Sequence, residues 1–347
     1  MGPLPEMMHA VLLTGHGGFE KLDYRDDVPV PHPQHGEVLI KVAAAGVNNT
    51  DINTRIGWYA ESASETEDAG WTGNAFSFPR IQGADCCGHI VAVGEGVDPV
   101  RVGERILVEP VFRNDDASLA DAVYFGSERD GAFAEYTVVP SVFAHTITSD
   151  LSDAELASFP CAYSAAENML TRAGVSVGET VLITGASGGV GSAAVQLAKR
   201  RGAHVIAVVG RDKTEAIYAL GANRAVDRGA DLPAALGCES VDVVIDVIGG
   251  QHFAGLLSVL KRGGRYAVAG AIAGPSVTLD LRTLYLKDLR LIGCTVLDSE
   301  VFSNLVSYIE RGEIKALLAA TYPLSEIVAA QATFLEKKHV GKIVLIP

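Results

Sequence analysis

Three features are scarce or missing in the sequence, and each absence excludes a class of protein. No segment approaches the apolar run of about 20 residues that a membrane-spanning helix needs, so we expect no membrane partner. The chain has 28 Lys and Arg residues against 42 Asp and Glu residues, a formal net charge of −14. Because nucleic-acid backbones are bound by clustered Lys and Arg side chains, this acidic balance argues against a nucleic-acid partner.

Cysteine is scarce as well. The five cysteines are odd in number and have no paired spacing, which fits a reducing cytoplasm better than a disulfide scaffold. Residues 1–8 lack the positive start and apolar core of a signal peptide, so we treat them as an extension ahead of the fold and expect a cytoplasmic protein. At 347 residues, with 48% hydrophobic and 20% charged residues, the chain has the composition of a soluble globular protein of two domains.

The most informative stretch that is present is residues 180–200, TVLITGASGGVGSAAVQLAKR. Residues 180–184 form an apolar, β-branched run of strand length, and from Val190 onward apolar residues recur at helical spacing. The glycine-rich turn between them fits A-x-G-x-x-G, which places Gly188 where backbone approaches a ligand and Gly191 where the helix packs on its strand. Helix N-termini bind anions, so the turn predicts a pyrophosphate site; a tight turn without a ligand has the same local pattern. The candidate cofactor contacts here are Ala186, Ser187, Gly188, Gly189, Val190 and Gly191.

The segments that follow continue the alternation of strands and helices. Apolar runs of strand length occupy residues 204–209, 241–247 and 266–269. Strands alternating with helices in this rhythm are typical of an α/β fold with a parallel, doubly wound sheet. In such sheets ligands bind beyond the carboxyl ends of the strands.

The first part of the chain reads mainly as β structure, with strands expected at residues 9–13, 37–42, 88–93 and 105–108. Two polar segments, residues 60–77 and 113–130, are predicted to be surface loops. Residues 60–78 are either a solvated loop or a substrate lid, because aromatic residues flank them. Helices are expected at residues 151–157, 164–173, 300–311 and 326–338, the last capped by Ser325, with a final strand at 343–346.

Several segments together resemble one known family over almost the whole chain. They are HAVLLTGHGGFEKL, GEVLIKVAAAGVNNTDINTRIGWY, GADCCGHIVAVGEGV, ASGGVG followed by AVQLAK, and the ending GKIVL. They resemble the medium-chain dehydrogenase/reductase superfamily and, within it, the zinc-independent quinone oxidoreductase branch. The resemblance implies a Rossmann dinucleotide-binding domain, residues 160–302, inserted into a GroES-like β-rich catalytic domain made of residues 1–159 and 303–347. It also implies an active site in the cleft between them.

The resemblance raises the question of zinc, since many members of the superfamily hold a catalytic metal. A catalytic zinc site needs about three protein ligands from Cys, His or carboxylate. At the matching positions this chain has Asn48, Ala84 and Cys161, so one ligand of three survives. Residues 113–130, where a structural zinc lobe would lie, contain no cysteine. We therefore expect a protein without zinc, in which Asp51 and Asp85 shape the cleft by hydrogen bonds.

The end of the second sheet strand bears on the choice of nucleotide. Domains that prefer NAD carry an acidic residue about 20 residues after the glycine loop, where this chain has Val209. Gly210 and Arg211 follow, and a guanidinium matches the geometry of a 2′-phosphate. This favours NADPH, with Lys213 as a second phosphate contact. The alternative is that Arg211 is a solvated residue whose charge is offset by Asp212.

NADPH without zinc predicts hydride transfer to an electron-poor carbon of a quinone, an enone or another activated carbonyl compound. The catalytic candidates are Asn48, Tyr59 and Asp51. By resemblance, Asn48 matches an active-site asparagine and Tyr59 a substrate-side tyrosine; a turn-capping role for Asn48 is an open alternative. A second tyrosine of the branch falls at Asn53 here, which argues against quinone as the physiological substrate.

Departures from the family pattern predict a reshaped pocket. A threonine common in the family is replaced by Ala165 and a small residue by Tyr163, so Tyr163 becomes a candidate for lining the substrate pocket and Ser164 a possible replacement donor, with simple packing as the alternative. Trp58, one of the aromatic residues that flank the loop, is a third pocket candidate. Further cofactor contacts are expected at Val247, Gly270 and, through the ending GKIVL, Lys342. The partners expected are a small-molecule substrate and a second copy of the chain, paired through the strand at residues 289–294.

Two other functions remain open at this point. The chemistry could be that of an alcohol/aldehyde or enoyl-thioester oxidoreductase on the same fold. A protein of another class, a non-catalytic NADPH-binding sensor or structural protein, would use the same glycine loop. A panel of electron acceptors separates the three.

Overall fold

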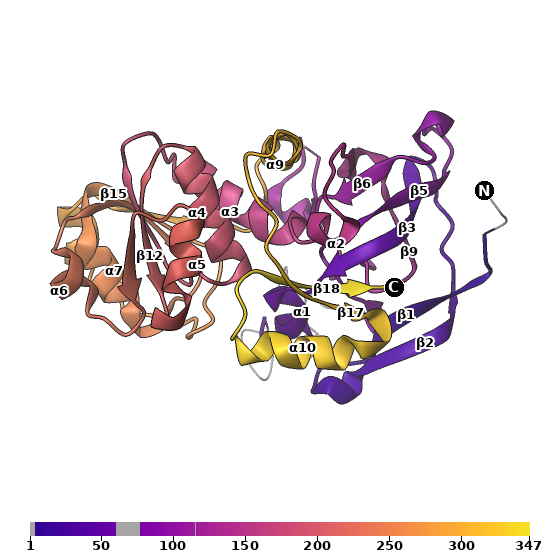
Figure 1. Cartoon of the computed structure of the whole chain (residues 1–347), viewed down its shortest axis with the longest axis horizontal. Coiled ribbons are helices and arrows are strands. Elements are labelled where there is room, and N and C mark those ends of the chain that lie inside the picture. The colour runs from indigo at the N-terminus through magenta and orange to yellow at the C-terminus, as the bar shows by residue number, and fades with distance from the viewer. Residues whose placement is uncertain (1–3, 60–76, 115) are drawn as a thin grey trace. The chain divides into compact units, whose positions relative to one another are not determined.

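The computed structural model describes residues 4–59, 77–114 and 116–347 and divides into two compact units (Figure 1). The β-rich unit comprises Met1–Cys161, Ile309–Arg311 and Lys315–Pro347, and the α/β unit comprises Ala162–Tyr308 and Gly312–Ile314. The predicted loop or lid at residues 60–78 lies outside the described residues, apart from its last two positions. In the part of the chain that is described, no helix is long and apolar enough to cross a membrane.

The α/β unit contains a six-stranded sheet in which every neighbouring pair is parallel. Its strands, in spatial order, are β13 (Arg224–Asp227), β12 (His204–Val209), β11 (Thr180–Ile183), β14 (Val241–Asp246), β15 (Leu260–Val268) and β16 (Arg290–Gly293). Figure 1 shows α4 (Gly189–Arg200) and α5 (Thr214–Ala219) on one side of this sheet, and α6 (Leu232–Leu236) and α7 (Phe253–Val259) on the other. The predicted doubly wound parallel sheet is confirmed.

The apolar strand runs explain why this sheet forms. Val181, Leu182 and Ile183 of β11 are all fully buried, as expected for a central strand covered by helices on both faces. The unit also contains α8 (Leu281–Leu286) and most of α9 (Val301–Glu310) and α3 (Pro160–Arg172). Proline at the first position of α3 is favourable because its fixed φ suits a helix start and its missing N–H would have no partner there.

The β-rich unit is built on a sheet in the order β10-β6-β5-β3-β18-β17, with β9 also pairing with β3. Its members are β3 (Glu37–Gly46), β5 (Cys87–Val93), β6 (Arg105–Val108), β9 (Tyr136–Pro140), β10 (Ala144–Thr146), β17 (Leu318–Pro323) and β18 (Lys342–Ile346). Smaller sheets are formed by β1 (Met7–Leu13), β2 (Leu22–Pro29) and β4 (Arg80–Ile81), and by β7 (Val111–Phe112) with β8 (Val123–Tyr124). The helices are α1 (Asn49–Arg55), α2 (Asp153–Leu156) and α10 (Ile327–Glu336).

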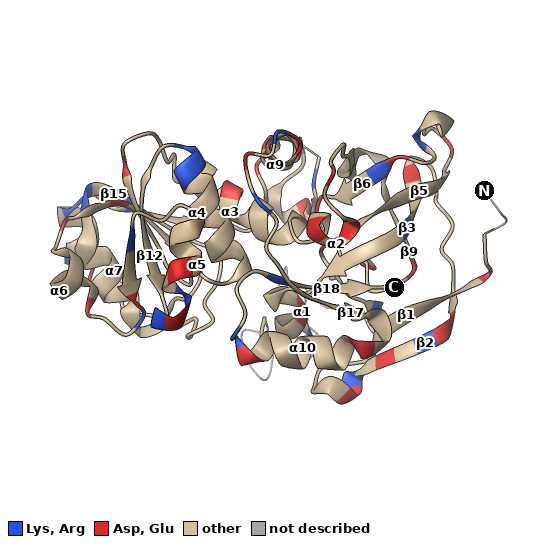
Figure 2. Ribbon diagram, viewed as in Figure 1, with Lys and Arg blue, Asp and Glu red and all other residues tan. Residues whose placement is uncertain are grey.

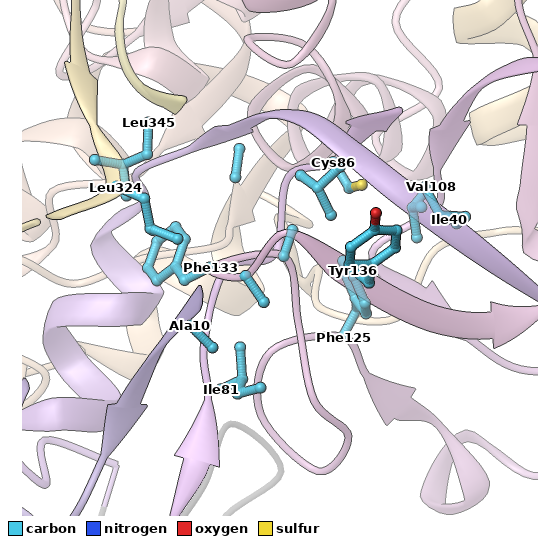
Figure 3. Close-up of a cluster of buried hydrophobic side chains, with 14 of the residues drawn as sticks. Ala10, Ile40, Ile81, Cys86, Val108, Phe125, Phe133, Tyr136, Leu324 and Leu345 are labelled. Atoms are coloured by element: carbon cyan, nitrogen blue, oxygen red, sulfur yellow. The ribbon is translucent and has the colours of Figure 1, made fainter. Parts of the chain in front are cut away.

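The core of the β-rich unit joins residues from both ends of the chain. Ala10, Phe133 and Leu345 belong to one buried cluster (Figure 3). The C-terminal strand β18 pairs antiparallel with β3, where Val344 lies opposite Gly46, and parallel with β17. This pairing brings the start of β18 next to the end of β3, which matters for the site described below.

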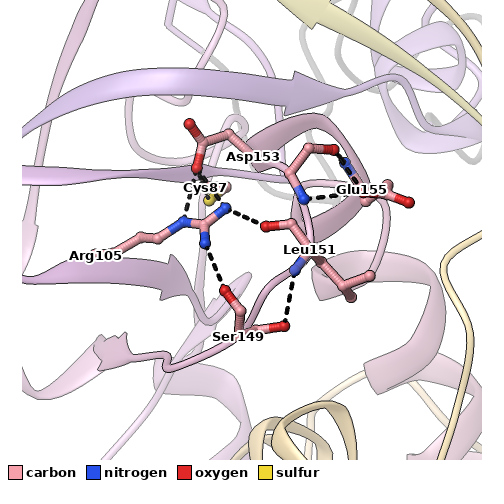
Figure 4. A network of polar contacts seen from close by, with 7 residues as sticks. Cys87, Arg105, Ser149, Leu151, Asp153 and Glu155 are labelled. Carbon is pink, nitrogen blue, oxygen red and sulfur yellow. Dashed lines mark hydrogen bonds and ion pairs between the residues drawn. The ribbon is translucent and has the colours of Figure 1, made fainter. Parts of the chain in front are cut away.

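One half-buried arginine, Arg105, fixes the segment that leads out of the main β-sheet. Arg105 donates from Nε to Asp153 Oδ1 at 2.7 Å, and its terminal nitrogens donate to the carbonyls of Ser149 and Leu151 at 3.0 and 2.6 Å (Figure 4). Burial and the neighbouring Asp153 raise the pKa of the Cys87 thiol beneath this network. Cys87 is therefore held as an unreactive thiol, and the arginine ties α2 to strand β6.

Two sequence expectations differ from the structure, and one strand was not predicted. Residues 113–130, predicted to be a surface loop, include strand β8 and the fully buried Phe125, whose ring lies 5.9 Å from that of Phe112. Its aromatic residues pack inward despite the polar composition. Helix α10 has Glu326 rather than Ser325 at its N-cap, because residues 324–326 form a short 3-10 turn. Strand β2 was not predicted, since five of its eight residues in succession are exposed.

Candidate active site

The predicted site residues fall into two groups, one in each unit, and each group is described by itself. The β-rich unit holds Asn48, Asp51, Trp58, Tyr59 and Lys342. The α/β unit holds Tyr163 and Ser164, the glycine loop and the residues at the ends of β12, β14 and β15. Charged residues of both signs are interspersed along each unit (Figure 2).

Asn48 lies at the junction of β3 and α1. Its backbone N–H donates to Asp51 Oδ2 at 2.7 Å, so Asp51 caps the first turn of the helix from its third position. Asp51 is almost fully buried, and burial raises its pKa to about 7, with the nearby Asp85 acting in the same direction and Lys342 opposing it. Gln82 donates to the Asp51 carbonyl at 3.0 Å. Asp51 therefore shapes the turn that presents Asn48.

Lys342 lies at the centre of this group. Its ammonium donates to Val47 O at 2.9 Å and to Asn48 Oδ1, and it forms an ion pair with Asp85 Oδ2 at 2.7 Å. Lys342 is 2% exposed and Asp85 is completely buried. An ammonium has three donors, and these three acceptors use all of them. The ammonium of Lys342 is thus fully engaged inside the β-rich unit. Its expected contact with the nucleotide stays a prediction.

The amide of Asn48 is engaged in the same way. Its Oδ1 accepts from Lys342, while its Nδ2 donates to Asp85 Oδ2 at 2.8 Å and to Gly46 O at 3.3 Å. The other oxygen of Asp85 accepts the backbone N–H of Cys161 at 2.6 Å. The Asn48 amide therefore bridges the Lys342 ammonium and the Asp85 carboxylate by hydrogen bonds. Its role in catalysis remains a prediction.

The residues that match the family's zinc ligands do not fit a metal. Ala84 has no donor atom, and the amide of Asn48 is bonded on both sides. Thiolates rather than thiols bind zinc, and burial together with Asp85 raises the pKa of the Cys161 thiol. The Lys342 ammonium already supplies a positive charge among these groups. Within the described ranges, no group of three or more His, Cys, Asp and Glu side chains is placed to hold a metal ion.

Tyr59 and Trp58 follow helix α1. The Tyr59 hydroxyl donates to Thr50 Oγ1 at 3.2 Å, and Asn53 Nδ2 approaches the same hydroxyl at 3.5 Å. Burial raises the pKa of Tyr59, so the phenol keeps its proton at neutral pH. Trp58 is 37% exposed and packs edge-on against Tyr59, with ring centroids 5.4 Å apart. The sequence reasoning missed Thr50, since only the fold shows that its hydroxyl meets Tyr59.

Tyr163 and Ser164 belong to helix α3 of the α/β unit. The Tyr163 hydroxyl accepts from Gln196 Nε2 of α4 at 2.9 Å, and burial raises the pKa of Tyr163. Both residues are 1% exposed. These contacts favour the packing interpretation over pocket lining, which stays a prediction for both.

The glycine loop contains glycines with different physical requirements. Gly185 has φ +57°, where a side chain is strained, and a Cβ on Gly191 would lie 2.2 Å from Gly185 O. Gly188, in contrast, has ordinary extended angles, and a Cβ there would approach nothing closer than Gly185 O at 3.5 Å. The fold itself therefore does not require glycine at position 188, and the expected close approach of a ligand there stays a prediction.

The start of α4 has the features of an anion site. Gly188 is the N-cap, and no side chain caps the helix. The first N–H groups of a helix have no intrahelical acceptor, and an anion satisfies them. The residues of this loop therefore fit the pyrophosphate of a dinucleotide.

Two cations follow the end of β12, the exposed Arg211 and the partly buried Lys213. Val209 is buried and Gly210 precedes a short 3-10 turn over Arg211–Lys213. Arg211 donates from Nε to Asp227 Oδ2 at 2.9 Å, but 88% of its side chain is exposed. Burial, with help from Arg228, lowers the pKa of Lys213. The end of this strand carries no acidic side chain of its own, but Asp227 of the neighbouring strand pairs with the arginine.

Comparison with known families decides the assignment. The family model for the alcohol dehydrogenase GroES-like domain matches residues 34–149, and the model for zinc-binding dehydrogenases matches residues 189–311. The acryloyl-coenzyme A reductase of Metallosphaera sedula is 30% identical, covering 97% of this chain and 99% of that protein. The chain belongs to the medium-chain dehydrogenase/reductase superfamily.

Other relatives place it in the quinone oxidoreductase-like branch of this superfamily. The NADPH-dependent alkenal/one oxidoreductase of Arabidopsis thaliana is 28% identical over 99% of this chain and 81% of that protein. The quinone oxidoreductase of Homo sapiens is 27% identical, with 98% of both chains covered. A solved structure of a putative alcohol dehydrogenase from Sinorhizobium meliloti 1021 is 52% identical, with a TM-score of 0.94, covering 99% of this chain and 98% of that chain. This member of the superfamily is an oxidoreductase, for which a nicotinamide cofactor is expected.

Proposed function

We propose that the protein is an NADPH-dependent, zinc-free oxidoreductase that transfers hydride to a quinone, an enone or another activated carbonyl compound. The observation that carries this proposal is the contact of Lys342 with Asn48 and Asp85. These residues occupy the neighbourhood of the family's metal ligands, and an internal ammonium neutralises the carboxylate there. This arrangement favours a reaction that needs no Lewis acid at this position.

The nucleotide half of the proposal rests on the α/β unit. When bound, the nicotinamide supplies the hydride. The uncapped start of α4 and the open position at Gly188 suit the pyrophosphate. Arg211 offers an exposed guanidinium for a 2′-phosphate, and Lys213 lies two residues further along. Val247 and Gly270, at the ends of β14 and β15, would offer main-chain contacts.

On the substrate side, the Tyr59 phenol is the best-placed donor. Its raised pKa keeps the O–H intact. The hydroxyl donates to Thr50 Oγ1 in the structure, and it would turn this proton from Thr50 to the substrate. A donated hydrogen bond would stabilise the negative charge that develops on a carbonyl oxygen when the conjugated carbon accepts hydride. Trp58, exposed beside Tyr59, would cover an apolar part of the substrate.

The names of the relatives support this substrate class. Alkenals and alkenones, quinones and an acryloyl thioester all present a carbon–carbon double bond conjugated to a carbonyl. The acryloyl-coenzyme A reductase also favours an enoyl-thioester as a second candidate substrate.

One screen tests the proposal. NADPH and NADH oxidation would be followed with quinones, enones, enoyl-thioesters and aldehydes, and zinc content would be measured on the same sample purified without added metal. We expect turnover with a conjugated acceptor, a preference for NADPH and zinc far below one ion per chain. Near one zinc per chain, or activity with saturated alcohols and aldehydes alone, contradicts the proposal. Tight NADPH binding without any turnover would point to a sensor.

We further propose that a second copy of the chain pairs along β16. This strand lies at the end of the sheet order, and the adjacent helix α8 exposes Leu281, Tyr285 and Leu286 by more than half of their surface. An unpaired strand edge beside exposed apolar side chains is suited to strand continuation across a twofold axis. Light scattering of the wild type and of Leu281→Glu/Tyr285→Glu tests it: we expect a dimer that the double variant dissociates, and a monomeric wild type contradicts it.

A further inference from the structure

Asp246, the last residue of β14, is a completely buried carboxylate held by neutral donors. Its Oδ1 accepts from Thr184 Oγ1 at 2.5 Å and from the Ile248 N–H at 2.9 Å. Its Oδ2 accepts from the Tyr266 hydroxyl, and the Gly249 N–H lies 3.2 Å from both oxygens. Among the residues that the structure describes, no Lys, Arg or His side chain forms an ion pair with it.

These contacts fix the backbone that follows β14. Thr184 Oγ1 donates to Asp246 and accepts the Val247 N–H at 3.1 Å. Three successive N–H groups, from Val247 to Gly249, therefore converge on Asp246 and its hydroxyl partner. The loop then turns sharply, with φ +64° at Gly249 and +68° at Gly250. A carboxylate with this many acceptor sites is what holds such converging donors in place.

The same carboxylate connects the loop to the glycine loop. Thr184 immediately precedes Gly185, and a Cβ on Gly185 would lie 2.8 Å from Cδ1 of Ile248. The turn after β11 and the turn after β14 are thus in close contact. Asp246 accepts a hydrogen bond from the Thr184 side chain before the first turn and from the backbone N–H groups of Ile248 and Gly249 in the second.

A third turn, after β15, packs on the same loop. The Ala269 N–H donates to Asp246 O at 3.2 Å, and the Ala273 N–H donates to Ile248 O at 2.8 Å. A Cβ on Gly270 would lie 3.0 Å from Val247 O. Tyr266, which donates to Asp246, belongs to β15 itself, and burial and Asp246 raise its pKa so that it remains a donor. Asp246 therefore lies at the junction of the turns that follow three adjacent parallel strands.

We propose that Asp246 is a positioning residue for the nucleotide, fixing the turns after β11, β14 and β15 so that their main-chain groups meet a pyridine dinucleotide. The inference rests on the proposed function and deepens it. In a doubly wound sheet, ligands bind beyond the carboxyl ends of the strands, which is where these turns lie. Because Asp246 acts through backbone shared by both nucleotides, it affects NADPH and NADH alike.

The test is the dissociation constant of each nucleotide, measured by fluorescence titration of the full-length protein. In Asp246→Asn the amide nitrogen replaces an acceptor by a donor, so one of the converging groups loses its partner. We expect the dissociation constants of NADPH and NADH to rise by the same factor, about tenfold or more. We also expect kcat at saturating nucleotide to change less than the dissociation constants do.

The same strand provides a matched control. Asp242, at the opposite end of β14, pairs with Lys261 at 2.8 Å and accepts the Thr180 N–H at 2.8 Å. Asp242→Asn should leave both dissociation constants within about twofold of the wild type, although it also loses an ion pair. If both variants lower the melting temperature and neither changes nucleotide affinity, Asp246 is merely structural and the proposal is overturned.

Two milder variants decide the matter should Asp246→Asn not fold. Tyr266→Phe and Thr184→Val each remove one hydroxyl from the junction, and both should weaken NADPH and NADH binding equally. Unchanged affinity in both overturns the proposal. A wild-type protein that binds neither nucleotide refutes the proposed function itself, which is a different outcome from a wild type that binds and variants that bind equally well.

Discussion

The two units each bury a carboxylate completely, and they compensate for it in different ways. Asp85 in the β-rich unit is paired with the Lys342 ammonium, and Asp246 in the α/β unit is held by hydroxyl and backbone donors. In a buried ion pair, removal of a single side chain lowers the stability strongly, since it leaves the other charge uncompensated. A carboxylate that accepts hydrogen bonds from several neutral donors is stabilised by all of them, so the loss of one donor costs less stability.

The difference matters for function. In the β-rich unit the Lys342 ammonium donates to Val47, Asn48 and Asp85, so the buried charge of Asp85 is balanced within the unit. In the α/β unit the buried carboxylate is satisfied without a cation, and Arg211 stays exposed at the end of β12. We therefore expect changes in the first unit to affect stability and the chemical step, and changes in the second to affect nucleotide affinity.

Lys342→Met is the most severe test of this contrast. It leaves the Asp85 charge buried without a compensating cation, and we expect it to lower the free energy of unfolding by about 3 to 5 kcal/mol. Chemical denaturation measures this. The control is Lys261→Met, because Lys261 also pairs with an aspartate but is 43% exposed; its loss should cost about 1 kcal/mol or less.

A second variant checks the cause of the destabilisation. Adding Asp85→Asn to Lys342→Met replaces the charge by a neutral amide, so part of the lost stability should return. Equal effects of Lys342→Met and Lys261→Met would show that the buried ion pair carries no special weight.

The charge state of Asp51 gives the next largest effect. Its carboxyl has a pKa of about 7 in the folded protein against an ordinary value of 3.8. Between these values the unfolded chain has released a proton that the folded chain still holds, so stability falls as pH rises through this window and is level above it. Three pKa units correspond to at most about 4 kcal/mol.

Asp51→Asn isolates this contribution. The difference in unfolding free energy between wild type and variant should shift against the wild type from about pH 4 to pH 7 and then stay constant. Denaturation curves at several pH values measure it. A difference that does not change with pH would mean that Asp51 titrates near its ordinary value in the fold.

Tyr59→Phe tests whether the β-rich unit acts on the substrate. Loss of one donor to a developing oxyanion lowers kcat by about 100-fold, while nucleotide affinity should stay unchanged. Steady-state rates with the best acceptor from the screen measure it. Tyr24→Phe, at an exposed tyrosine, is the control and should have wild-type rates. An unchanged kcat in Tyr59→Phe would remove the phenol from the mechanism.

The sequence predicted one unit better than the other, and the reason is physical. The central strands of the parallel sheet that were predicted are mostly apolar, such as residues 205–209, and burial on both faces makes that pattern readable. Strand β2 is mostly exposed and polar, so periodicity could not reveal it. Residues 113–130 looked like a solvated loop because composition averages over Phe125, which tertiary packing buries.

The site shows the same limit. The glycine loop is local in sequence, and its geometry follows from spacing alone. The partnership of Lys342 and Asn48 joins residues 294 positions apart, and only the pairing of β18 with β3 brings them together. A lysine at the start of the apolar run KIVLI and an aspartate within GADCCG were signals that each needed a buried partner. Neither signal names the partner.

Arg211→Ala is the mildest test and addresses the α/β unit alone. Loss of a charge-assisted contact to a 2′-phosphate should raise the NADPH Michaelis constant about tenfold and leave that of NADH nearly unchanged. The control is Arg282→Ala, because Arg282 is also an exposed arginine paired with an aspartate, at 2.8 Å. Equal losses with both nucleotides would show that Arg211 supports the turn through Asp227 rather than the phosphate, and the preference for NADPH would then have to come from elsewhere at the end of β12.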